Sequence, residues 1–76
     1  MTYSTVDLIK KHSDLARKAG QNEQGINIAR FNAKIAIELN SIKDRGVMVI
    51  TDGVLNTLRR QAHDFTYGVK KSDHYF

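Results

Sequence analysis

The stretch EQGINIARFNAKIAIELNSIKD, residues 23–44, decides the fold. One stripe of large apolar side chains in it recurs every three or four residues, which is the period of one face of an α-helix. They are Ile28, Phe31, Ile35, Leu39 and Ile42. The polar side chains Asn27, Arg30, Lys34, Glu38 and Ser41 fall on the opposite face. We therefore predict a long amphipathic helix over 23–44, capped by Asn22 and ended by Gly46.

A second helical pattern precedes it, over residues 5–19. Ser4 is a suitable cap because its hydroxyl can accept a hydrogen bond from the free amides of the first turn. Asp7 suits the positive end of the helix dipole. Gly20 is expected to end the helix in the left-handed conformation. The apolar stripe of this helix is Leu8, Ile9, His12, Leu15, Ala16 and Ala19, which places His12 at the edge of the core.

The segment after Gly46 allows two interpretations. Val47–Ile50 is rich in β-formers and is followed by Asp52-Gly53, so a hairpin with strands 47–51 and 54–58 is one of them. The other is a third helix over 53–65. We favour the helix, because Leu58 and Phe65 continue the helical spacing beyond any hairpin. Val47–Ile50 is then either an extended buried connection or a strand that pairs with another copy of the chain.

These elements predict an all-α fold: one small domain holding a bundle of three helices, at about 5–19, 23–44 and 53–65. A short extended segment lies at 47–50, and an irregular tail covers 67–76. Because the core is thin for one chain, homodimerisation through the long helix or through 47–50 is a hypothesis. The predicted core is Leu8, Leu15, Ile28, Phe31, Ile35, Leu39, Ile42, Met48, Ile50, Leu55, Leu58 and Phe65.

The composition excludes several classes of function. The chain has 76 residues and no cysteine, so it has no disulfide, thiolate zinc site or thiol nucleophile. His12, His63 and His74 show no metal-ligand spacing. We expect no catalytic residues, no metal and no cofactor, and hence no enzyme, because a small core does not easily hold a preorganised site. No apolar run approaches the length of a membrane span, so we expect a soluble, cytoplasmic protein with no membrane partner.

The stretch DLARKAGQNEQGINIA, residues 14–29, resembles the helix-turn-helix DNA-binding motif. Ala16, Gly20 and Ile26 stand where that motif has a buried alanine, a turn glycine and a buried aliphatic residue, as two helices crossing steeply require. The resemblance implies that Gln21, Asn22, Gln24, Asn27 and Arg30 face DNA bases. The alternative, which we favour, is a plain αα-hairpin with a glycine joint.

Basic residues give a second signal. The formal net charge is +4, with 12 Lys and Arg against 8 Asp and Glu. Such residues attract phosphate backbones by releasing counterions. The candidate nucleic-acid contacts are Lys10, Lys11, Arg17, Lys18, Asn27, Arg30, Lys34, Arg59, Arg60, Lys70 and Lys71. The alternative is an ordinary solvated surface of mixed charge, because Asp7 and Asp14 stand at i,i+4 before Lys11 and Lys18 and are expected to pair with them.

The C-terminal tail interleaves aromatic rings with lysines. Tyr67, Tyr75 and Phe76 are candidate anchors for docking into a larger protein, and rings near lysines could instead stack on the bases of a single strand. A disordered tail, or one folded back on the core, is the interpretation we favour.

We predict a small, basic, non-enzymatic accessory or regulatory protein that binds nucleic acid, DNA or RNA, through the basic face of its first two helices. The alternative is an adaptor or inhibitor that docks on a larger protein, such as a nucleic-acid-processing enzyme, through an apolar helix face or the Tyr75-Phe76 tail. In style, such a short, basic, cysteine-free chain resembles the small accessory proteins of large phages.

Overall fold

The computed structural model describes residues 1–68. The chain order is β1 (Thr2–Ser4), α1 (Thr5–Ala19), the 3-10 turn η1 (Glu23–Gly25), α2 (Ile26–Asp44), β2 (Val49–Thr51) and α3 (Asp52–Tyr67). The prediction of an all-α bundle of three helices is confirmed. Of the two interpretations of the segment after Gly46, the third helix is the one that forms.

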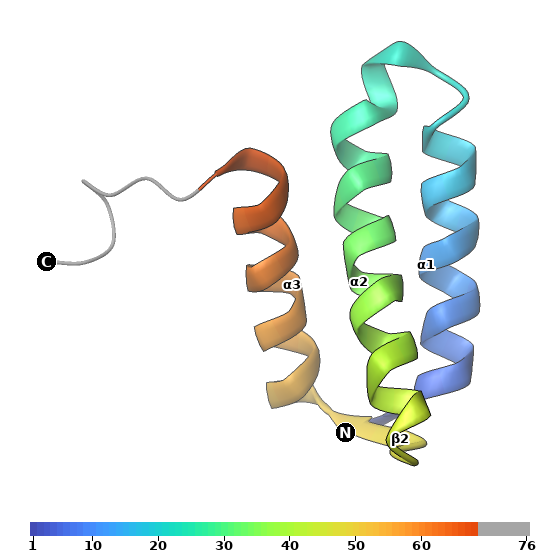
Figure 1. Cartoon of the computed structure of the whole chain (residues 1–76), viewed down its shortest axis with the longest axis vertical. Coiled ribbons are helices and arrows are strands. Elements are labelled where there is room, and N and C mark those ends of the chain that lie inside the picture. Colours follow the sequence, from blue (N-terminus) through green and yellow to red (C-terminus); the bar gives the residue numbers. More distant parts are fainter. Residues whose placement is uncertain (69–76) are drawn as a thin grey trace, which may run out of the picture.

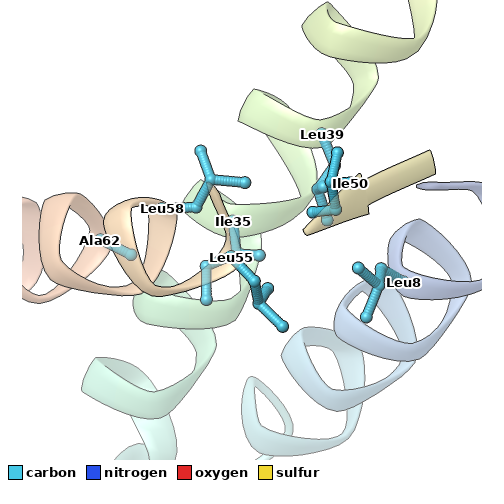
Figure 2. Packing of buried hydrophobic residues seen from close by; sticks show 7 residues of the cluster. All are labelled: Leu8, Ile35, Leu39, Ile50, Leu55, Leu58 and Ala62. Carbon is cyan, nitrogen blue, oxygen red and sulfur yellow. The ribbon is translucent and has the colours of Figure 1, made fainter. Parts of the chain in front are cut away.

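Helix α2 is the centre of the bundle. Helix α1 runs antiparallel to it on one side, and α3 packs against its other side (Figure 1). Ile35 and Leu39 of α2 are therefore covered from both sides and have no exposed surface. Figure 2 shows how Leu8 of α1 and Leu55 of α3 converge on them. The remaining members of this core cluster are Ile50, Leu58 and Ala62.

Four residues predicted to lie in the core are exposed instead. Leu15 is 41%, Met48 50%, Phe65 53% and Ile28 54% exposed. Phe31 and Ile42 pack against the core but stay partly exposed.

Side-chain caps fix where the helices begin. The Ser4 hydroxyl accepts from the Asp7 amide at 3.3 Å, as predicted. The Asn22 side chain also caps, accepting from the Gln24 amide at 2.9 Å. It caps η1, however, so α2 begins at Ile26, three residues later than predicted.

Three glycines near the ends of α1 and α2 have different backbone roles. Gly20 keeps right-handed backbone angles (φ −68°), so the predicted left-handed end of α1 is wrong. Gly46 does adopt the left-handed region, with φ +88°, just beyond α2. Gly25 is required by a close approach, because a Cβ there would collide with the carbonyl group of Ala19. This glycine lets the turn between α1 and α2 close tightly.

The extended segment predicted at 47–50 is present, but it is not a buried connection, because only Ile50 within it is buried. Strand β2 forms an antiparallel ladder with β1, in which Tyr3 faces Ile50. Thr5, which is buried, adds two hydrogen bonds between the start of α1 and the segment before β2. Its amide donates to the Met48 carbonyl at 2.9 Å, and its hydroxyl donates to the Val47 carbonyl at 3.1 Å. Figure 1 shows the resulting ribbon closing one end of the bundle.

The ribbon is tied to the start of α3 through Asp52. The Tyr3 hydroxyl donates to Asp52 Oδ1 at 2.6 Å, and the N-terminal ammonium lies 3.3 Å from Asp52 Oδ2. The hydrogen bond to this carboxylate, and the carboxylate's negative charge, raise the pKa of Tyr3 above its usual value.

A polar pair lies buried between α1 and α2. His12 is 4% and Asn32 6% exposed, so the position of His12 on the apolar stripe is confirmed. His12 Nδ1 lies 2.8 Å from Asn32 Oδ1, and Asn32 Nδ2 donates to the Ile28 carbonyl at 2.9 Å. Because the amide nitrogen is used there, Asn32 Oδ1 is the acceptor and His12 Nδ1 the donor. His12 Nε2 is buried without a hydrogen-bond partner among the described residues.

Helix α3 is longer than predicted. It extends to Tyr67 and ends at Gly68, whose φ is +81°. The irregular tail predicted over 67–76 therefore begins too early, and its residues 69–76 lie outside the described part of the chain. No helix within residues 1–68 is long and apolar enough to cross a membrane.

Candidate nucleic-acid interface

The outer surface of α1 carries four of the predicted contact residues. Because Thr5, Leu8 and His12 turn inward, the helical period places Lys10 and Arg17, seven residues apart, on the side away from α2. Lys11 and Lys18, also seven residues apart, share the neighbouring row. All four are exposed. We call the set Lys10, Lys11, Arg17 and Lys18 the α1 basic surface.

The predicted ion pairs on this surface are not formed. Asp14 pairs with Arg17 rather than with Lys18, and no pair joins Asp7 to Lys11. Within residues 1–68, no carboxylate lies within 4.0 Å of the ammonium group of Lys10, Lys11 or Lys18. Three of the four cations on the α1 basic surface therefore lack a carboxylate neighbour in the described part of the chain.

The structure does not bring the cations of α2 onto the α1 basic surface. Arg30 and Lys34 face α3, where the Arg30 guanidinium carbon lies 5.6 Å and Lys34 Nζ 5.2 Å from the centroid of the Phe65 ring. Lys34 Nζ also bonds Glu38 at 3.0 Å. We call Arg30, Lys34 and Phe65 the α2–α3 cluster.

The remaining candidates are spread over α2, α3 and the tail. Asn27, Arg59 and Arg60 are exposed on their helices. Tyr67, predicted in a tail, lies instead in the last turn of α3, 52% exposed, with its ring centroid 4.9 Å from that of His63. Lys70, Lys71, Tyr75 and Phe76 lie outside the described residues.

The helix-turn-helix arrangement is not formed. Helices α1 and α2 lie side by side as an αα-hairpin, which was the favoured alternative (Figure 1). Ile26, which the motif needs as a buried aliphatic residue, is 52% exposed. The side chain of Asn22 caps η1. The recognition helix that the resemblance implies is therefore not formed, and the favoured αα-hairpin is.

Phe65 is the residue of interest that sequence reasoning missed, since its helical spacing assigned it to the core. The sequence shows only the cations of this arrangement and not the position of the ring. Arg30 and Lys34 stand at i,i+4 on the polar face of α2, so any ring placed beside that face meets two cations. No three His, Asp or Glu side chains gather to hold a metal ion within residues 1–68.

Comparisons with protein-family models, with curated proteins and with solved structures find no match to this chain. The function therefore has to be argued from the surfaces themselves.

Proposed function

We propose that the protein is a small accessory factor that binds nucleic acid, with the α1 basic surface on the phosphate backbone. The observation that supports this is the set of three exposed lysines, Lys10, Lys11 and Lys18, with no carboxylate within 4.0 Å in the described residues. A cation already paired to a carboxylate gains little by meeting a phosphate, whereas an unpaired one releases a condensed counterion from the nucleic acid.

The spacing of these lysines suits a phosphate backbone. Lys11 and Lys18 are two helical turns apart, about 10 Å along the axis. Each strand of a duplex carries one negative charge per about 3.4 Å, so about three phosphates of a single strand in that geometry lie within the span. Contacts of this kind carry no sequence information, which fits a surface without a recognition helix.

The test is a salt titration of oligonucleotide binding, followed by fluorescence anisotropy. We compare the unaltered chain with a Lys10→Gln/Lys11→Gln variant. The matched control is Lys43→Gln/Arg45→Gln, which removes the same number of charges from exposed residues at the C-terminal end of α2. Starting at about 50 mM salt, the first variant should weaken binding and flatten the plot of log K against log salt by about one per lost contact, and the control should do neither.

Equal losses in both variants would contradict the assignment to α1, because net charge alone would then explain the binding. Absence of binding to duplex DNA, single-stranded DNA and RNA at about 50 mM salt, where phosphate contacts are strong, would end the proposal.

A further inference from the structure

Phe65 has an unusual setting for an aromatic residue on the packed side of a helix. Its neighbours on that side, Leu58 and Ala62, are 6% and 0% exposed, whereas Phe65 is 53% exposed. The ring is not free, because Arg30 and Lys34 of α2 both lie within cation–π distance of it. The Phe65 side chain therefore remains 53% exposed although two cations lie over its ring.

The cation nearest the ring is itself held in place. The Lys34 side chain is 27% exposed, and its Nζ bonds Glu38 at 3.0 Å. Arg30, one turn earlier on α2, makes no ion pair within residues 1–68 and is exposed. The α2–α3 cluster thus combines an open ring, a positioned lysine and an arginine without a carboxylate partner in the described part.

Single-stranded nucleic acid has the groups that bind an exposed aromatic ring and nearby cations. The face of an unpaired base stacks on an aromatic side chain, and the adjoining phosphates bind the cations. In a duplex both faces of each interior base are already stacked on neighbouring bases, so such a ring finds no base to accept. A ring of this kind distinguishes single strands from duplexes and is tolerant of sequence.

We propose that the α2–α3 cluster is a stacking site for an unpaired base, so that the nucleic acid bound by this protein is single-stranded. This inference rests on the proposed function and specifies its substrate class. Phe65 supplies the stacking surface, and Arg30 supplies the cation for an adjoining phosphate. The α1 basic surface adds affinity that does not depend on strandedness.

The test compares single-stranded and duplex oligonucleotides of matched length on the full chain. Phe65→Leu keeps an apolar side chain and removes the aromatic face. It should weaken single-strand binding by about 5- to 150-fold, the range for loss of one stacked base, and leave duplex affinity within about twofold. The control is Met48→Ala, which removes a half-exposed apolar side chain just before β2, away from the α2–α3 cluster, and should leave the single-strand affinity unchanged.

A second variant keeps the proposal testable if Phe65→Leu alters folding, which circular dichroism would show. The chain has no tryptophan, so Phe65→Trp introduces a single indole at the site. Its emission should be quenched when single-stranded oligonucleotide binds and remain unchanged with duplex. Binding of a single strand with no change in emission would overturn the proposal.

The outcomes separate this inference from the proposed function. If the unaltered chain binds no oligonucleotide, both fail. If it binds duplex and single strand alike, and Phe65→Leu changes neither, the proposed function stands and the stacking site does not. A protein partner that survives nuclease treatment and is lost by Phe65→Leu would assign the ring to a protein interface and overturn the inference.

Discussion

The buried pair of His12 and Asn32 gives the sharpest prediction about stability. The perturbation is Asn32→Leu, which replaces a 6% exposed amide by an apolar side chain of similar size. It removes the acceptor that lies 2.8 Å from His12 Nδ1. Because His12 Nε2 already lacks a partner in the described residues, the variant leaves both ring nitrogens buried and unsatisfied.

The expected size follows from the cost of such groups. A buried donor left without a partner costs about 1–3 kcal/mol, part of which the buried leucine offsets. We expect Asn32→Leu to lower the free energy of unfolding by about 1–2 kcal/mol. His12→Leu should lower it by a smaller amount, because it leaves Asn32 Oδ1 buried without its donor but also removes the unsatisfied Nε2.

The double variant is the informative one. Replacing both partners by apolar groups can be nearly neutral, so His12→Leu/Asn32→Leu should be far more stable than the sum of the single losses predicts. We expect a coupling free energy of about 2 kcal/mol. Urea denaturation followed by circular dichroism measures all four chains, with an unchanged m-value as the check that the fold is kept.

Additive losses would refute the reasoning. If the double variant lost the sum of the two single effects within about 0.5 kcal/mol, the hydrogen bond between the two helices would contribute nothing specific.

Two further predictions concern the ends of the bundle. The hydrogen bond to Asp52 raises the pKa of Tyr3, so Asp52→Asn should lower the pH at which this tyrosine ionises in a spectrophotometric titration. The stability from this contact is present below pH 10.0 and is lost as the pH rises through the raised pKa of Tyr3. An unchanged titration curve in Asp52→Asn would contradict this prediction. Gly25→Ala should destabilise by about 1–3 kcal/mol, because its Cβ meets the Ala19 carbonyl, whereas Gly53→Ala, with space around it in α3, should not destabilise. Equal thermal midpoints for Gly25→Ala and Gly53→Ala would contradict the predicted collision at Gly25.

The helices could be predicted because their signals are local. Ser4 and Asn22 cap the amides next to them, and the apolar stripe of α2 needs only its own spacing. The pairing of β1 with β2 could not be predicted, because it joins residues that lie far apart in the sequence, such as Tyr3 and Ile50. A strand of three residues has too few side chains for its sequence pattern to indicate which strand it pairs with.

The basic residues of the candidate interface could be named from the sequence, but which of them lie together in the fold could not. Helical period alone places Lys11 and Lys18 in one row, and the structure keeps them there. Whether Asp14 pairs with Lys18 or with Arg17 depends on rotamers that compete within a small free energy, and Arg17 is the partner. Phe65 continues the stripe of α3, yet its exposure depends on where α3 lies along α2, which only the assembled bundle determines.

The central claim is that unpaired lysines of α1 bind phosphates, and the salt dependence of binding by the unaltered chain tests it most directly. Each lysine that meets a phosphate contributes about −0.7 to −0.9 to the slope of log K against log salt. Contacts by Lys10, Lys11 and Lys18 therefore predict a slope of about −2 to −3. A slope near zero, or no binding at about 50 mM salt, would contradict the account.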